Sequence, residues 1–315
     1  MSRRICSKMS SKVIRKIQIG DAEYPSNLKT IHSPPRALYV NGSLKEEDSD
    51  AVTIVGSRRA TPYGLETAER LAFDIASRGV TVVSGMARGI DSAAHKGALR
   101  ARGRTIAVMG SGHGHIYPPE NKDLYARIAD SGAVVSEFEN DVAPLPKNFP
   151  IRNRIISGLS LGLVVVEAAR NSGALITADF ALEQGRDVFA VPGKVSSETS
   201  GGTNELIKDG AKLIQTADDA LEELKLHHIK NISARDGANM DERIAKKTHA
   251  YIYNSLTDDE RKAYKILSDE PLYIDDIARQ SKIAAPKIAK VLLGLEIKKV
   301  IKQLPGKNFV RIENV

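Results

Sequence analysis

Short apolar runs alternate with amphipathic segments between about residues 50 and 225. Most of the runs are apolar throughout, as in TIAVMG and LGLVVVEA, which is typical of strands that are covered on both faces. The predicted strands cover residues 51–55, 80–84, 104–109, 133–136, 162–167, 187–191 and 211–215. The predicted helices cover residues 62–78, 91–102, 121–130, 155–160, 175–184 and 217–226. This alternation predicts βαβ units, and therefore a doubly wound α/β fold with a mostly parallel sheet.

The flanking segments have different patterns. Residues 24–44 contain two adjacent prolines and the extended sequence ALYV, which predicts an edge strand. Residues 227–255 are polar and charged without a sustained apolar period, and we interpret them as a linker. Three short amphipathic helices are predicted after the linker, over residues 256–267, 274–280 and 286–295. A β-prone hairpin follows these helices, so residues 256–315 are predicted to form a small winged-helix domain.

Composition narrows the class of protein. A chain of 315 residues that is 42% hydrophobic is long enough for one large domain, predicted over residues 21–226, and a small second one. It contains no apolar run of about 18 residues and no secretory pattern, so we expect a cytoplasmic protein that does not contact a membrane. The single cysteine, Cys6, excludes a disulfide framework within the chain and a multi-cysteine metal site.

The formal net charge of +7 is compatible with nucleic-acid binding, but a basic balance also serves solubility alone. Residues 1–20 hold six basic residues and no acidic one. We interpret this segment as a disordered leader, with an electrostatic arm or a transit peptide as the alternatives. The positions of the cations must therefore decide between these functions.

Ligands of an open parallel sheet bind beyond the carboxyl ends of its strands, so the turns after the strands hold the candidate residues. The first turn, TIVGSRRATPYG, begins like a dinucleotide-binding turn but carries serine and arginines in place of the fingerprint glycines. Small residues let backbone N–H groups approach an anion, and arginine adds a bidentate fork. The candidate phosphate-binding residues in the first two turns are Gly56, Ser57, Arg58, Arg59, Gly85 and Arg88. The alternative is that each is an ordinary tight turn.

The segment PLPKNFPIRNRIISGLS combines cations with an aromatic ring at the mouth of a predicted helix. Its candidate residues are Lys147, Phe149, Arg152, Asn153 and Arg154. Cations pair with the phosphates of a single strand while an exposed base stacks on a ring, so this loop suits a flexible single-stranded nucleic acid. Alternatively, Phe149 staples the helix to the core, and the arginines are solvated or pair with Glu137 or Glu139. Secondary anion-binding turns are predicted at Ser172, Gly173, Gly201, Gly202 and Thr203.

Other polar residues near these turns favour structural roles. Asp91 is predicted to cap the helix that follows it, and His95 to be a half-buried helical histidine. Glu167 ends an apolar strand, where a carboxylate either holds loop N–H groups or acts as a general acid or base. The histidines lack metal-ligand spacing, so no metal or other cofactor is expected.

Several strings together resemble the DNA-processing protein A family, also called Smf. They are IVGSRRATPYG, VVSGMARGIDSAAHKGAL, TIAVMGSG, IYPPENKDLY, VVSEF, NFPIRNRIISGLS, VVVEAARNSGALITADFALEQGRDVFAVPG and GTNELIKDGAKLI, over about residues 20–225. The resemblance implies a Rossmann-like core that is not an enzyme, binds single-stranded DNA without sequence preference and forms a homodimer. It also implies that the protein protects this DNA and promotes loading of the RecA recombinase during natural transformation and recombination. The family's phosphate-binding turn falls on Gly56, Ser57 and Arg58, and its DNA loop on Lys147, Phe149, Arg152 and Arg154.

Two other functions stay open. The fold also resembles lysine-decarboxylase-like phosphoribohydrolases, which cleave nucleoside monophosphates, but Ser172, Gly173 and Ala174 depart from the Pro-Gly-Gly-x-Gly-Thr turn of those enzymes. The third interpretation is a regulator in which the winged helix binds DNA, with Lys287 and Lys290 on its recognition helix.

Overall fold

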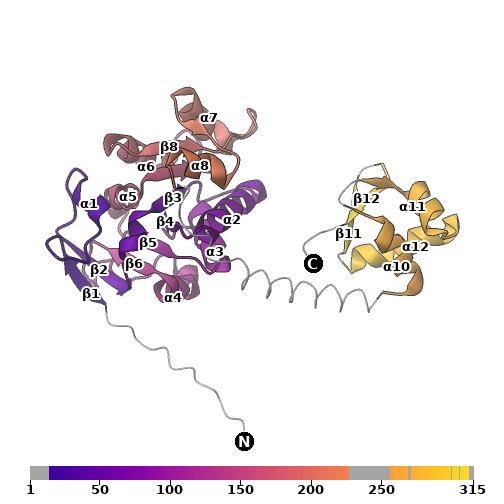
Figure 1. The fold of residues 1–315 in the computed structure, drawn as a ribbon, viewed down its shortest axis with the longest axis horizontal. Helices are drawn as coiled ribbons and strands as arrows, with labels where there is room; N and C mark the ends of the chain where they lie inside the picture. The colour runs from indigo at the N-terminus through magenta and orange to yellow at the C-terminus, as the bar shows by residue number, and fades with distance from the viewer. Residues whose placement is uncertain (1–13, 227–255, 269–270, 299, 305, 312–315) are drawn as a thin grey trace, which may run out of the picture. The chain divides into compact units, whose positions relative to one another are not determined.

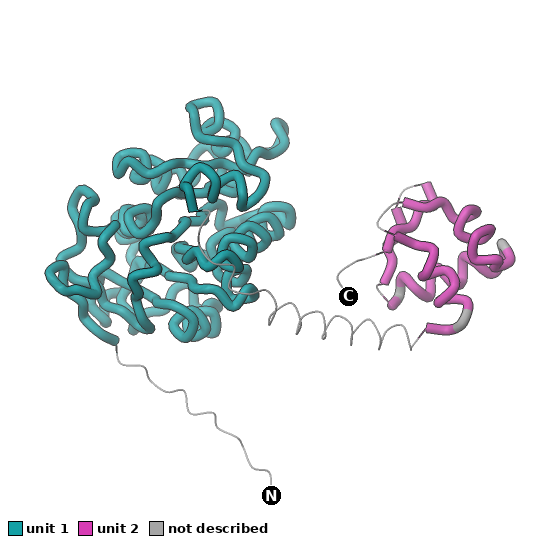
Figure 2. Tube along the Cα trace, in the orientation of Figure 1, with its two compact units in different colours: residues 1–232 teal, residues 233–315 magenta. Residues whose placement is uncertain are grey.

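The computed structural model describes residues 14–226, 256–268, 271–298, 300–304 and 306–311. The chain divides into two compact units, residues 1–232 and residues 233–315 (Figure 2). Each unit has its own hydrophobic core, and each is described by itself. The predicted linker over residues 227–255 lies outside the described residues, as do residues 1–13.

The first unit is built on a nine-stranded sheet with the strand order β1-β2-β6-β5-β4-β3-β7-β8-β9. Figure 1 labels the strands from β1 to β6 and β8. The strands are β1 (Arg15–Gln18), β2 (Ala37–Gly42), β3 (Ala51–Val55), β4 (Thr81–Ser84), β5 (Thr105–Met109), β6 (Ala133–Ser136), β7 (Gly162–Val165), β8 (Asp187–Ala190) and β9 (Lys212–Leu213). The strands from β6 to β9 in this order pair in parallel, and β1 and β2 add an antiparallel edge. The predicted α/β fold with a mostly parallel sheet is confirmed.

Helices cover both faces of this sheet. They are α1 (Ser26–Lys29), α2 (Pro62–Ser77), α3 (Ile90–Arg100), α4 (Lys122–Ser131), α5 (Asn148–Gly158), α6 (Gly173–Glu183), α7 (Gly201–Lys208) and α8 (Ala217–Glu223). Short 3-10 helices are η1 (Glu46–Ser49), η2 (Pro119–Asn121) and η3 (Glu198–Ser200). Alternate residues of β3 face opposite sides: Val52 and Ile54 join the core with α2 and α3, whereas Ala51 and Val55 join the core with α5 and α6. This arrangement explains why β3 is buried throughout and carries mostly apolar side chains.

The start of α2 lies where the sequence predicts it. The predicted N-cap Thr61 accepts a hydrogen bond from the Gly64 backbone N–H at 3.2 Å, and Pro62 is the first residue of α2. Proline suits that position because its missing N–H would have no partner within the helix.

Three predictions about these elements were wrong. Helix α5 begins at Asn148, seven residues before the predicted start at residue 155. The ALYV segment forms β2, which lies between β1 and β6 and is not at the edge. The edge strand is β1, whose residues Arg15–Gln18 fall inside the predicted leader and pair with β2 instead.

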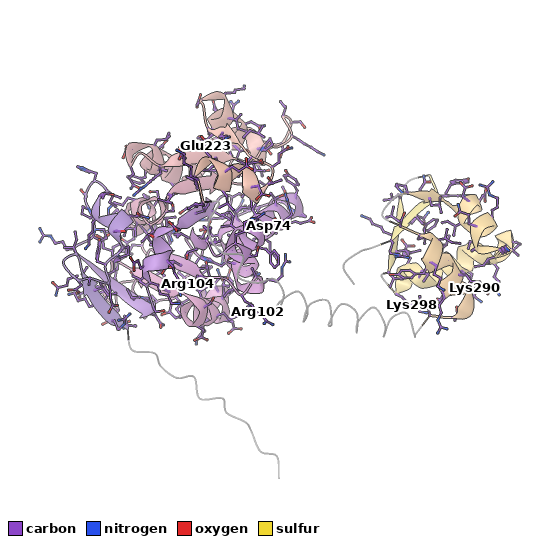
Figure 3. All side chains as sticks on the ribbon, in the orientation of Figure 1. Asp74, Arg102, Arg104, Glu223, Lys290 and Lys298 are labelled. Carbon is purple, nitrogen blue, oxygen red and sulfur yellow. The ribbon has the colours of Figure 1, made fainter. Side chains whose placement is uncertain are left out.

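The second unit contains helices α10 (Asp258–Ile266), α11 (Ile274–Ser281) and α12 (Ala285–Ile297) with strands β10 (Leu272–Tyr273), β11 (Ile301–Leu304) and β12 (Asn308–Arg311). The strand order is β10-β12-β11, and all pairings are antiparallel. The three helices and the hairpin enclose a small core that includes Ile277, Leu292 and Phe309. The predicted winged helix is confirmed, and Figure 3 labels two of its lysines, Lys290 and Lys298. Within the described ranges, no helix is long and apolar enough to cross a membrane.

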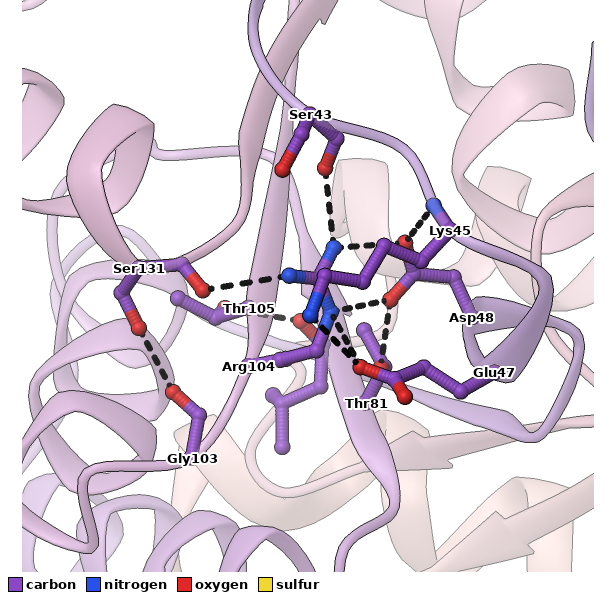
Figure 4. A network of polar contacts seen from close by, with 10 residues as sticks. Ser43, Lys45, Glu47, Asp48, Thr81, Gly103, Arg104, Thr105 and Ser131 are labelled. Atoms are coloured by element: carbon purple, nitrogen blue, oxygen red, sulfur yellow. Dashed lines mark hydrogen bonds and ion pairs between the residues drawn. The ribbon is translucent and has the colours of Figure 1, made fainter. Parts of the chain in front are cut away.

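A buried ion pair holds the amino ends of β4 and β5 to η1. The Arg104 guanidinium donates to both carboxylate oxygens of Asp48, at 2.8 Å and 2.7 Å, and to the carbonyl oxygen of Ser43 at 2.8 Å (Figure 4). The Thr81 hydroxyl donates to the same carboxylate at 2.8 Å. Only 6% of the Asp48 side chain is exposed, so removing one partner leaves a charge without compensation in the protein interior.

We therefore expect Asp48→Ala to lower the free energy of unfolding of the first unit by about 3 kcal/mol. Urea denaturation of the full chain, followed by circular dichroism, measures this change. Lys45→Ala is the matched control, because it breaks an exposed ion pair with Glu47 on the same edge. The control is expected to cost less than about 1 kcal/mol, and an equal loss in both variants would contradict the role given to Asp48.

Candidate functional site

A cavity of about 650 Å³ lies where the strand order of the sheet reverses. From β3 the chain adds β4, β5 and β6 on one side, and then returns to add β7, β8 and β9 on the other. The helices that follow these strands, α2 after β3 and α6 after β7, pack on opposite faces of the sheet, which creates the usual ligand crevice of a doubly wound fold. The predicted site residues that line the cavity are Gly56, Ser57, Arg58, Arg59, Phe149, Arg152, Asn153, Ser172 and Gly173.

The turn after β3 is fixed on both sides. The Ser57 N–H donates to the carbonyl oxygen of Glu167 at 2.6 Å, and the Ser57 carbonyl oxygen accepts from the N–H of Ile90 at 3.2 Å. A side chain at Gly56 would come within 2.6 Å of Ile90 and 2.8 Å of the Glu167 carbonyl oxygen. Glycine is therefore needed for close packing, while the side chains of Arg58 and Arg59 remain exposed beside the cavity.

The Glu167 carboxylate has a structural task. It is 3% exposed, and it accepts hydrogen bonds from the backbone N–H and the hydroxyl of Thr61, at 2.9 Å and 2.6 Å. These contacts join the end of β7 to the start of α2. They match the interpretation in which Glu167 holds loop N–H groups.

Phe149 lies in the first turn of α5, not in a loop as predicted. The guanidinium carbon of Arg58 lies 5.3 Å from the centre of its ring, within the range of a cation–π contact. The Tyr117 ring lies 5.6 Å from the Phe149 ring, centre to centre. A side chain at Gly110 would come within 2.9 Å of the ring, so Phe149 is packed on one part and open to the cavity on another.

Arg152 is not a surface cation. It is 3% exposed, and its Nη1 donates to the carbonyl oxygen of Gly85 at 2.7 Å and to that of Val108. A side chain at Gly85 would come within 2.7 Å of both this nitrogen and Oδ2 of Asp91. Gly85 therefore makes room for a buried guanidinium and carboxylate, which is a correction to its predicted role in phosphate binding.

Asp91 and Arg152 change each other's proton affinity. Burial raises the pKa of Asp91, while the nearby Arg152 charge opposes that shift. Burial lowers the pKa of Arg152 to about 10, so the guanidinium remains charged at neutral pH. Asp91 does not cap α3 as predicted, because Gly89 occupies the N-cap position and Asp91 lies inside the first turn.

Several predicted residues lie outside this cavity. Arg154 faces the other side of α5 and forms an ion pair of 2.6 Å with Glu137, as the alternative interpretation proposed. Arg88 is exposed and pairs with Glu120. Lys147 is exposed immediately before α5.

The predicted anion-binding turn at residues 201–203 forms the first turn of α7. The Gly202 N–H donates to the Ala168 carbonyl oxygen at 2.7 Å, and the Thr203 hydroxyl donates to the Ser200 carbonyl oxygen at 3.1 Å. Gly202 and Thr203 are buried, whereas Gly201 lines a separate hollow beside Arg170. Gly202 and Thr203 therefore stabilise the start of a helix and are not presented to the cavity.

Tyr117 was not among the predicted site residues, although it lines the cavity and is 39% exposed. Its signal is an aromatic residue directly before two prolines, in the segment that follows β5. Among the described residues, no cluster of three or more His, Cys, Asp and Glu side chains could hold a metal ion.

The residues that line this cavity lie in the part of the chain that matches a known family model. The model described as DNA recombination-mediator protein A matches residues 15–225, and the DprA winged helix domain matches residues 252–307. The chain belongs to the DNA recombination-mediator protein A family. Protein Smf of Escherichia coli strain K12 is 40% identical over 298 residues, which cover 93% of this chain and 76% of that relative. DNA processing protein DprA of Bacillus subtilis strain 168 is 41% identical over 228 residues, 72% of this chain and 77% of that relative.

Solved structures agree with this assignment to the DprA family. DNA processing protein A from Streptococcus pneumoniae is 41% identical with a TM-score of 0.64, over 67% of this chain and 74% of that one. The Helicobacter pylori protein is 31% identical with a TM-score of 0.60, over 67% of this chain and 96% of that one. The second structure concerns the single-stranded DNA binding mode of the Helicobacter pylori protein.

His95 lies beneath the site on α3 and is fully buried, not half-buried as predicted. The Thr105 hydroxyl donates to the Val82 carbonyl oxygen at 2.7 Å, so it accepts from Nδ1 of His95, also at 2.7 Å. Burial lowers the pKa of His95 to about 3, and the Arg152 charge adds to the shift. The folded state therefore holds neutral imidazole where the unfolded chain takes up a proton.

We expect this difference to make the first unit less stable in acid. The contribution of His95 is complete above the unfolded pKa near 6.5 and is lost as the pH falls toward the folded pKa of about 3. Between about pH 7 and about pH 5 the loss amounts to about 2 kcal/mol. His95→Gln removes this part of the pH dependence, and urea denaturation of both proteins over that range measures it. A variant with the same pH dependence as the parent would show that His95 does not titrate in this way.

Proposed function

We propose that this DprA family protein binds single-stranded DNA without reading its sequence. The observation that carries the proposal is the arrangement of Arg58 and Phe149 at the strand-order reversal, where an exposed guanidinium and an aromatic ring share one cavity. A guanidinium pairs with a phosphate of any nucleotide, and a ring stacks on any base. The single-stranded DNA binding mode described for the Helicobacter pylori relative supports the same ligand.

The cavity wall divides into two kinds of surface. Ser57, Arg58 and the start of α6 at Ser172 and Gly173 provide hydroxyl, guanidinium and backbone N–H groups. Tyr117 and Phe149 provide rings on the side of α5. A strand that follows this wall can place its phosphates along the first surface and an unpaired base along the second. A duplex would present phosphates while keeping its bases stacked inside the helix.

The two carboxylates nearest to the cavity support a role in binding over one in catalysis. Glu167 is occupied by Thr61, and Asp91 lies beside the buried Arg152. Each carboxylate already has a structural partner, so neither is presented as a general acid or base. We therefore propose a binding protein and not a phosphoribohydrolase.

The family description as a recombination mediator supports a further step. We infer that the protein acts as a homodimer, protects the bound strand, and promotes loading of the RecA recombinase during DNA uptake by natural transformation and recombination. Binding at the cavity would leave the rest of the strand free for the recombinase. A test is RecA filament formation on single-stranded DNA in the presence of a single-strand-binding competitor, with and without this protein.

The test of the ligand is a titration with labelled single-stranded DNA, duplex DNA and a mononucleotide at two salt concentrations. We expect tight, salt-dependent binding of the single strand and much weaker binding of the other two. Release of free base from the mononucleotide would instead support the enzyme. Tight binding of the duplex alone would support a regulator that acts through its winged helix.

Arg58→Ala tests the residue that carries the proposal. The variant is expected to weaken binding of all sequences alike and to reduce the slope of log K against log salt by about 0.7, because one phosphate contact is lost. Lys45→Ala removes a charge at the opposite edge of the sheet and should leave the slope unchanged. If Arg58→Ala binds with the same slope as the parent protein, Arg58 does not contact the nucleic acid.

A further inference from the structure

A second hollow, of about 420 Å³, lies on the other side of the turn after β3. Arg58 and Arg59 line both this hollow and the first cavity, so the two depressions lie on either side of the same turn. The second hollow is bounded by α2, by the start of α3 and by η2. Its further basic residues are Arg88 and Lys96, both of which are exposed.

The charges around this hollow are unevenly compensated. Glu69 is held by Arg100 on the neighbouring turn of α3, with an ion pair of 2.8 Å. Glu120 pairs with Arg88, and half of each of these two side chains is exposed. Arg59 and Lys96 add two more exposed cations on the same wall. A polyanion entering the hollow therefore meets a surplus of positive charge.

The backbone that carries these cations is tightly closed. Gly89 has a φ of 73°, and a side chain there would collide with the carbonyl oxygen of Ser57. The N–H of Ile90 donates to that same oxygen at 3.2 Å. The start of α3 is thereby fixed against the turn that carries Arg58 and Arg59. The backbone segments that carry the cations of both hollows are therefore held together.

We propose that the single strand leaves the first cavity over Arg58 and Arg59 and continues into the second hollow, where Arg88 and Lys96 contact its phosphates. This inference rests on the proposed function and extends the binding track along α3. The occupant is a phosphodiester backbone, because the walls of the hollow offer cations but no aromatic ring for a base.

Glu120 is an internal competitor for this strand. Its carboxylate accepts a hydrogen bond from Nε of Arg88, the group that a phosphate would use. The ion pair between Arg88 and Glu120 is weak enough to be exchanged for a phosphate contact, since both side chains are about half exposed and such pairs contribute little to stability. A phosphate must replace the carboxylate, and the carboxylate also repels it. Removing the negative charge of Glu120 should therefore strengthen DNA binding.

The experiment compares Glu120→Gln and Lys96→Ala in the full-length protein, with oligothymidylates of about 4 and about 16 nucleotides, which span common site sizes. We expect Glu120→Gln to tighten binding of the long strand about twofold to fivefold at low salt, the size of an exposed ion pair. We expect Lys96→Ala to weaken it and to reduce the salt slope by about 0.7. Both variants should bind the short strand like the parent protein.

Matched controls lie at the opposite edge of the sheet, where Lys45 and Glu47 form a similarly exposed pair. Lys45→Ala removes one positive charge, as Lys96→Ala does, and Glu47→Gln removes one negative charge, as Glu120→Gln does. Neither control variant should change the binding of the long or the short strand. The track is refuted if Glu120→Gln and Lys96→Ala bind the long strand as the parent does while Arg58→Ala still weakens it. Loss of the Arg58→Ala effect as well would overturn the proposed function itself, so the two failures are distinguishable.

Discussion

The site depends on the burial of one guanidinium. Arg152 reaches from α5 to the carbonyl oxygens at the ends of β4 and β5, and the missing side chain of Gly85 makes room for it. Both carbonyl oxygens belong to residues at the carboxyl edge of the sheet, so this contact fixes α5 over that edge. Phe149 and Asn153 flank Arg152 on the same helix and take their positions in the cavity from it. The positive charge beneath the cavity is a by-product of this structural contact.

The arginines at the carboxyl edge of the sheet therefore differ in burial and in their partners, and these differences do not follow the sequence motifs. Arg152 is buried, Arg154 and Arg88 are paired with carboxylates, and Arg58 faces the Phe149 ring. Each carboxylate or carbonyl partner lies far along the chain from its arginine, at a separation of 17 residues for Glu137 and 67 for Gly85. Pairings of this kind arise from the strand order. A list of basic residues therefore overstates the uncompensated positive charge at this edge.

The alternation of apolar runs was enough to predict the parallel strands β3 to β8, because strands buried on both faces leave a continuous signal. The start of α5 could not be found in the same way. The helix begins at Asn148 and includes Pro150 in its first turn, where a missing N–H costs nothing. The position of the cavity followed from the topology, because the turns after parallel strands meet at one edge. The carboxylate and carbonyl partners of the arginines could not be predicted in this way, because these contacts join segments that lie far apart in the sequence.

In the winged helix, too, some basic residues of the sequence form ion pairs within the unit. Lys287 and Lys298, at the two ends of α12, form ion pairs with Asp259 and Glu260 of α10. Glu260 also caps α10 through Thr257, so this carboxylate is fixed in place by the helix start that it stabilises. Two of the lysines that a recognition helix would offer to a duplex are thus compensated within the unit, while Lys290 stays exposed. Since duplex affinity comes largely from neutralising phosphates, this compensation supports the proposal that the first unit, and not the winged helix, binds the DNA.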